Sequence, residues 1–142
     1  MKPGMRQLAI AEHLLTKSYP SLKDPKILLS VLQNLLAAID EAISKHLQEA
    51  RSKHEIPPYN NTLNGRLNAA RIHLAKQLDI KKVDFMMISE IQETLAEHEQ
   101  APTEFRRNNA LIIADENFKL TKLDEQKTKT YMSRTRTLLS RL

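Results

Sequence analysis

The sequence predicts one mainly α-helical domain over residues 1–142, an antiparallel bundle of about five helices. Two observations carry this prediction. Gly supplies only 2 of 142 residues, and the good helix formers Ala, Leu, Lys, Glu and Gln dominate. Apolar residues also recur every three or four positions through most of the chain, as they do along one face of an amphipathic helix. A chain of this length can bury one sufficient core without disulfide or metal support.

The first two helices are marked by prolines. We expect a first helix over Met5–Tyr19, which Pro20 ends because proline disfavours helix in the residue before it. Asp24 is a good N-cap and Pro25 suits the first helical position, so a second helix begins there and continues to about Lys53. Its broad apolar face predicts the central, most buried element.

Two further helices follow a proline-rich loop near mid-chain. Thr62 is expected to cap a third helix whose apolar positions extend to Leu78. Asp84 is expected to cap a fourth helix, in which Ile88 and Ile91 belong to the inward stripe, and Pro102 is expected to end it.

The segment before the last helix has a different pattern. Residues 110–114 and 118–123 are two short, largely apolar or alternating runs around the polar turn 115–117, which is typical of a β-hairpin. A kinked helix over 110–123 would use the same residues, and both alternatives stay open. Asp124 is then expected to cap the last helix, with Tyr131, Thr135 and Leu138 facing inward.

Composition removes several classes of site. The chain has no Cys, which excludes disulfides, thiolate nucleophiles and zinc–thiolate sites and is in keeping with a cytoplasmic protein. No Glu-x-x-His pair occurs, although carboxylate–histidine metal sites in helical bundles use that spacing. No apolar run approaches about 18 residues. We therefore expect no metal, no cofactor and no transmembrane segment.

Charge is concentrated at the end of the chain. Residues 1–118 contain 15 basic and 15 acidic side chains, whereas residues 119–142 contain seven basic and two acidic ones. On the last helix the basic residues flank the apolar stripe, an arrangement that can contact RNA phosphates or an anionic membrane surface. These candidate binding residues are Lys127, Lys129, Arg134, Arg136 and Arg141. The alternative is a solvated helix whose charges pair with acidic neighbours such as Glu90, Glu93 and Glu97.

A second polar cluster is expected where the fourth helix meets the following loop. His98, Glu104 and Arg107 are the candidates for a catalytic role there, and Arg106 is a further candidate for binding. The alternative is structural: the polar groups cap the helix end, Glu104 pairs with an arginine, and Phe105 plugs the bundle.

Two resemblances accompany these residues. Arg6 and His13, and again Arg66 and His73, are separated by six residues, which is similar to the Arg-x(4–6)-His signature of the HEPN helical-bundle family. That family includes many RNases, so the resemblance would imply RNA binding or metal-independent RNA cleavage. Leu67 follows Arg66, where the family prefers a polar residue.

The second resemblance covers the stretches 97–107 and 111–118 and the early residues 19–20 and 23–26. These look like segments of a group of small uncharacterised archaeal helical-bundle proteins, and this resemblance implies no activity. Together the observations favour a non-enzymatic interaction module that binds a protein partner or forms a homodimer. RNA binding or cleavage of HEPN-like type is the alternative, and peripheral association with an anionic membrane through the last helix is a second one.

Overall fold

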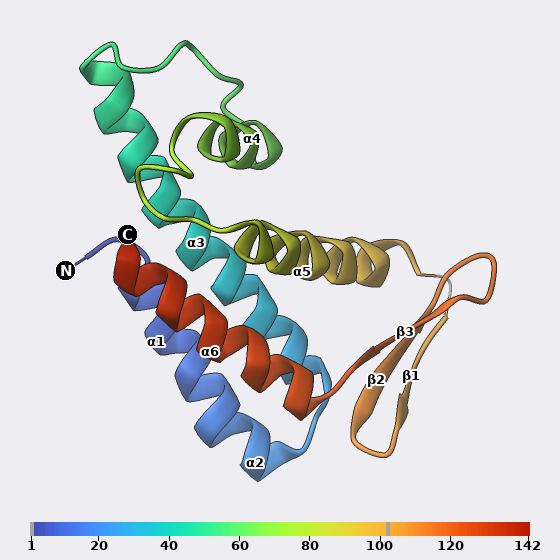
Figure 1. Cartoon of the computed structure of the whole chain (residues 1–142). Helices are drawn as coiled ribbons and strands as arrows, with labels where there is room; N and C mark the ends of the chain where they lie inside the picture. Colours follow the sequence, from blue (N-terminus) through green and yellow to red (C-terminus); the bar gives the residue numbers. More distant parts are fainter. Residues whose placement is uncertain (1, 102) are drawn as a thin grey trace.

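The computed structural model describes residues 2–101 and 103–142, and the chain there is mainly helical (Figure 1). Within these ranges it forms five helical segments and one small antiparallel sheet, which precedes the last helix. The predicted mainly helical class, with about five helices, is confirmed.

The first helix runs past the proline that was expected to end it. α1 (Met5–His13) continues through the π-helical turn η1 (Leu14–Ser18) into α2 (Tyr19–Leu22), so Pro20 lies inside the helix. In the π-helical turn the Tyr19 N–H bonds to the Leu14 carbonyl, five residues back. This wider turn gives the proline ring the space that a regular α-helical turn would not.

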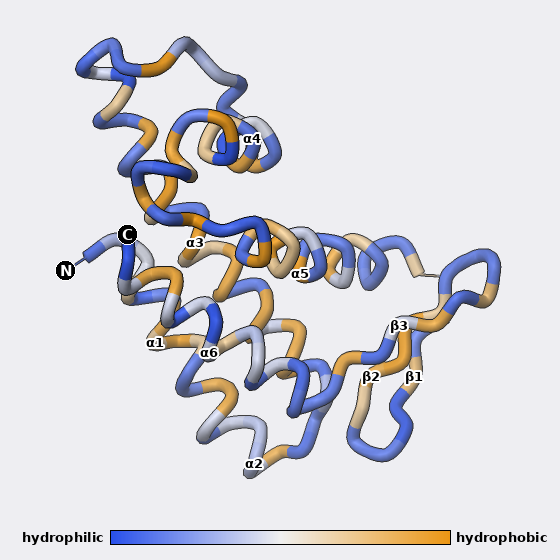
Figure 2. Tube along the Cα trace, viewed as in Figure 1, coloured by the Kyte–Doolittle hydropathy of each residue, from blue (hydrophilic) through white to orange (hydrophobic). Residues whose placement is uncertain are grey.

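The central element is α3 (Lys26–Ser52), and it packs against α1, α4, α5 and α6. Pro25, and not Asp24, is its N-cap, so the helix begins one residue later than predicted; the Asp24 carboxylate still accepts a hydrogen bond from the Lys26 N–H at 3.0 Å. Gly4 has a φ of 87° and lies so close to α3 that an added Cβ would be 2.5 Å from the Ala38 carbonyl oxygen. Figure 2 shows apolar residues recurring along α3. The fully buried ones include Leu28, Leu32, Leu35, Ile39, Ile43 and Leu47.

Among the described helices, α3 is the one that is long and apolar enough, by length and composition, to cross a membrane. In the structure, 50% of its most apolar window is buried inside the protein. The core helix of a soluble protein meets the same criterion, so this is weak evidence for a span.

Two shorter helices pack on the same side of the molecule. α4 (Leu63–His73) is capped by Thr62 as predicted, since the Thr62 hydroxyl accepts from the Gly65 N–H at 3.0 Å. It ends before Leu78, because the following residues form turns.

α5 (Lys82–Gln100) begins one residue after Lys81, which is the N-cap. Asp84 is therefore not the N-cap that was predicted. It lies in the first turn, where its carboxylate accepts from the Lys81 N–H at 2.9 Å. The predicted end at Pro102 lies outside the described residues.

The hairpin prediction is confirmed, and the structure adds a third strand. β2 (Ala110–Ala114) pairs with β3 (Leu120–Leu123), and β1 (Thr103–Arg107) pairs with the other edge of β2; both pairings are antiparallel. Asn108 and Asn109 connect β1 to β2, with φ of 51° and 62°. Two successive positive φ values are the geometry of a type I′ hairpin turn, for which asparagine is well suited.

The last helix, α6 (Glu125–Arg141), is capped by Asp124 as predicted, at 2.8 Å from the Lys127 N–H. The predicted antiparallel bundle is not confirmed. Figure 1 shows α6 running beside α3 in the same direction, and His46 of α3 meets the Leu142 carbonyl just after α6 ends, at 2.8 Å. The sheet carries the chain from the end of α5 back to the level where α3 begins.

Candidate functional site

The predicted corner after α5 is only partly assembled. His98, near the end of α5, and Glu104, on β1, approach to 2.5 Å between Nδ1 and Oε2. Arg106 extends away from them and donates to the Lys23 carbonyl at 3.0 Å, with the Asp24 carboxylate at 3.5 Å. Glu104 thus pairs with a histidine and not with an arginine.

Strand alternation explains why this corner is divided. Successive side chains on a strand point to opposite faces, so Phe105 and Arg107 share one face of the sheet and Glu104 lies on the other. Phe105 is 42% exposed and does not plug the bundle. His98 and Glu104 therefore form an isolated pair, to which Arg107 adds nothing. In the described part of the chain, no group of three His, Cys, Asp or Glu residues has a metal-binding arrangement.

Four of the five basic candidates on α6 are bound by neighbouring groups. Arg141 is the most enclosed: its guanidinium contacts the Asp84 carboxylate at 3.2 Å and the Asp79 carbonyl at 3.2 Å, which ties the end of α6 to the start of α5. The other contacts are Lys127 to the Lys122 carbonyl at 2.9 Å, Lys129 to Glu125 at 3.0 Å, and Arg136 to Glu12 at 3.3 Å. Arg134 is exposed. Much of the positive charge of α6 is thus locally compensated.

Two of the three acidic residues expected to neutralise α6, Glu90 and Glu97, bind uncharged groups instead. The Tyr131 hydroxyl donates to the Glu90 carboxylate at 3.0 Å. Burial of the ring and this hydrogen bond together raise the pKa of Tyr131 to about 12. Glu97 accepts a hydrogen bond from Thr121. These contacts join α5 to α6 and to β3.

The two arginine–histidine pairs lie apart from these clusters. Arg66 binds the Asp40 carboxylate of α3 through two hydrogen bonds, at 2.7 and 2.9 Å, and this contact raises the pKa of the arginine. His73, at the end of α4, and both Arg6 and His13 on α1 are exposed. Arg66 thus fastens α4 to α3.

Sequence reasoning missed an exposed apolar surface on the sheet. We call it the outer sheet face: Phe105 on β1 and Leu120 on β3 lie on either side of Ile112 of β2, which is buried at 7% exposure, and Phe118 stands in the turn before β3. Phe105, Leu120 and Phe118 are 42%, 59% and 86% exposed. Leu111, Ile113 and Leu123, on the opposite face, belong to the core. Two of the chain's three phenylalanines are therefore exposed on the sheet or its hairpin turn.

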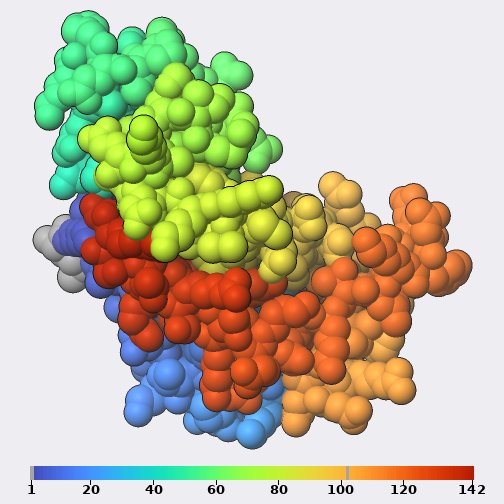
Figure 3. Space-filling model, viewed as in Figure 1, coloured from blue at the N-terminus to red at the C-terminus, as the bar shows by residue number. Residues whose placement is uncertain are grey.

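The hairpin tip holds Phe118 in an unusual conformation. Its φ is 62°, in the left-handed region that bulky residues rarely adopt. The turn is held by hydrogen bonds: the Phe118 N–H donates to the Asp115 carbonyl at 3.0 Å, and the Asp115 carboxylate accepts from the Asn117 and Lys119 N–H groups, both at 2.8 Å. Figure 3 shows the hairpin projecting from the helical body. The ring is thus presented to solvent by a well-formed turn.

Comparison with protein families, curated proteins and solved structures finds no match. The functional argument therefore rests on the geometry of the chain itself.

Proposed function

We propose that this chain is a non-enzymatic interaction module, a helical bundle that docks a partner protein on the outer sheet face. The observation that carries the proposal is the exposure of Phe105 and Leu120 on one small sheet and of Phe118 on its hairpin turn. Contiguous apolar surface on a soluble protein commonly marks an interaction site, and aromatic side chains are enriched at the centres of interfaces. The chain has few aromatic residues, and two of them, Phe105 and Phe118, are exposed here.

The size of the face indicates the kind of complex. From their exposed fractions, the three side chains offer on the order of 350 Å² of apolar area. A standard stable interface buries about 800 Å² on each partner. The apolar residues would therefore form the centre of an interface whose rim is polar.

The charged residues beside the outer sheet face indicate which partner it can bind. Arg107 and Lys122 flank the apolar residues on the outer face, since Arg107 is opposite Ala110 and Lys122 is opposite Ile112 in the strand pairing. Two copies placed face to face would bring these cations together, which disfavours self-association. The surface fits a partner segment with an aromatic or aliphatic anchor and flanking acidic residues.

A peptide-display selection tests this directly. A random-peptide library is selected on the immobilised protein, and the enriched peptides are synthesised and titrated. We expect an apolar anchor beside Asp or Glu, and at least about tenfold weaker binding to the double variant Phe105→Ser, Leu120→Ser.

Leu22→Ser is the matched control, because Leu22 is 68% exposed on α2, outside the sheet. Unchanged affinity in the double variant, or equal losses in both variants, would refute the proposal. Sedimentation velocity would reveal whether the native protein is a dimer. If it is, and if the double variant is a monomer, the occupant of the outer sheet face is a second copy of the chain instead.

RNA binding and membrane association through α6 stay alternative proposals, each with its own test. Phosphate contacts predict RNA affinity that falls steeply between about 50 and about 200 mM salt. Arg134 is exposed on α6 and is not among the basic residues bound by neighbouring groups, so it is the first residue to substitute in a test of RNA binding. Flotation of the whole protein with anionic vesicles tests the membrane alternative.

A further inference from the structure

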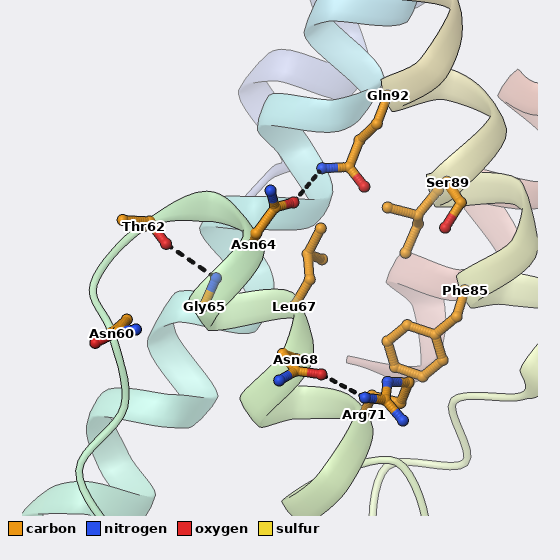
Figure 4. A pocket seen from close by; sticks show the side chains of 11 residues that line it. Asn60, Thr62, Asn64, Gly65, Leu67, Asn68, Arg71, Phe85, Ser89 and Gln92 are labelled. Carbon is orange, nitrogen blue, oxygen red and sulfur yellow. Dashed lines mark hydrogen bonds between the residues drawn. The ribbon is translucent and has the colours of Figure 1, made fainter. Parts of the chain in front are cut away.

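A groove of about 480 Å³ lies between α4 and α5, away from the sheet (Figure 4). Both helices pack on α3, and the space between them is open to solvent. Leu67 and Ile88 supply buried apolar surface at its base. Its polar side chains are Asn60, Thr62, Asn64, Asn68, Arg71, Ser89 and Gln92.

The walls of the groove are two antiparallel rows of side chains. On α4 the row includes Asn64, Asn68 and Arg71, and on α5 it runs from Phe85 to Gln92. Gln92 donates to the Asn64 side-chain oxygen at 2.9 Å, while Figure 4 shows Arg71 and Phe85 at the opposite end. Each row extends over eight residues, which is seven steps of helix or about 10 Å.

The spacing of the carboxamides matches an extended peptide. Asn64 and Asn68 are four residues apart, about 6 Å along a helix. An extended chain repeats the same side of its backbone every two residues, about 6.6 Å. The Asn64 and Asn68 oxygens each already accept one hydrogen bond, from Gln92 and from Arg71. Each oxygen keeps a second lone pair and each NH₂ group can donate, so successive Asn side chains can still pair with alternate peptide groups.

The groove carries a single positive charge among its lining residues. Arg71 is the one charged residue among those that line it, and Asn68 accepts a hydrogen bond from its guanidinium. A guanidinium fork binds carboxylates through two parallel hydrogen bonds. The groove therefore suits a neutral backbone with one acidic group at the Arg71 end, and it disfavours cationic ligands.

The far end of the groove is fixed by a close backbone approach. The loop before α4 passes so near the helix that a Cβ on Gly65 would be 2.0 Å from the Asn60 carbonyl oxygen. Glycine at this position lets Asn60 form the end wall. In the described part of the chain, the Asn60 and Ser89 side chains have no protein hydrogen-bond partner, so they are free to bind a ligand.

We propose that this groove binds a short extended peptide segment, with its main chain along the carboxamides and an acidic side chain on Arg71. The site is separate from the outer sheet face, and the two proposals stand or fall independently.

The test uses the peptide acetyl-Ala-Ser-Ala-Asp-amide as a probe, titrated into the whole isotope-labelled protein. The side-chain NH₂ signals of Asn64, Asn68 and Gln92 report binding in two-dimensional NMR. We expect these signals to shift, and the Asn-terminated version of the peptide to bind about three- to tenfold more weakly, because it loses the contact with Arg71. A version with methylated backbone nitrogens should shift none of them.

Variants give the same test from the protein side. Asn68→Ala and Arg71→Gln should each weaken the probe about three- to tenfold. Gln33→Ala and Arg134→Gln are matched controls, since both side chains are exposed on other helices. The controls and the double variant of the outer sheet face should bind as the native protein does.

Three outcomes would overturn the proposal: no shift of the groove signals at any soluble peptide concentration, equal binding of the methylated peptide, or tighter binding of adenosine monophosphate at the same signals. The last result would assign the groove to a nucleotide.

Discussion

Phe118→Asn is expected to leave the free energy of unfolding within about 0.5 kcal/mol of the native value, although it removes a large aromatic side chain. Phe118 is 86% exposed, so about a seventh of its surface is buried. For a side chain of about 200 Å² this is near 30 Å², which contributes about 0.7 kcal/mol at ~25 cal/mol per Å².

Relief of an unfavourable backbone conformation changes the free energy of unfolding by a similar amount in the opposite direction. Phe118 has a φ of 62°, and the left-handed conformation costs a residue with a β-carbon on the order of 1 kcal/mol. Asparagine adopts this conformation more readily, because its short polar side chain can bond locally. The two terms nearly cancel, so the fold itself gives no reason for phenylalanine at the tip.

Urea unfolding followed by circular dichroism measures the effect, with Leu123→Ala as the reference. Leu123 is fully buried on the opposite face of the same hairpin, and its truncation should cost about 2–5 kcal/mol. A loss above about 2 kcal/mol for Phe118→Asn would refute the reasoning, because it would show the ring buried in solution.

Two further predictions concern the helices. Tyr131→Phe should remove part of the stability loss at alkaline pH: the pKa of Tyr131 is raised to about 12, so between about pH 10 and pH 12 the unfolded state releases a proton that the native state keeps. The native protein should therefore lose at most about 2.7 kcal/mol over that window relative to the variant. An equal change in the free energy of unfolding of the two proteins, measured by urea titration at about pH 9 and about pH 11, would contradict the raised pKa of Tyr131. Gly65→Ala should lower the melting temperature, with a cost of about 1–3 kcal/mol, because its Cβ would be 2.0 Å from the Asn60 carbonyl oxygen. An unchanged melting temperature would place the Asn60 loop elsewhere.

The elements that the sequence predicted well have strong local signals. Thr62 and Asp124 hold the starts of their helices through the expected N-cap hydrogen bonds, and Asp24 bonds to Lys26 just before the observed N-cap Pro25. The prediction that Pro20 ends the first helix was wrong, because a π-helical turn is stabilised by its surroundings and has no sequence signature of its own. β1 was missed because its alternation is weak, although the Asn108-Asn109 turn after it was a usable signal.

The functional surfaces depend on tertiary placement, and that is why sequence reasoning did not find them. The strand pairing, and not the spacing along the chain, places Phe105 beside Ile112 and away from the core. The α4–α5 groove likewise exists because α4 and α5 both pack on α3 and leave a space between them. The sequence correctly placed basic residues along α6, but it did not show that Arg136 and Arg141 form ion pairs with residues of α1 and α5.

The most direct test of the outer sheet face as the docking surface is an NMR map of a bound peptide from the display selection. Backbone amide signals of residues 103–123 are expected to shift on titration, with the largest changes at Phe105, Phe118 and Leu120, while those of α6 stay in place. Shifts confined to α6, or to the α4–α5 groove, would contradict the assignment of the sheet as the interaction surface.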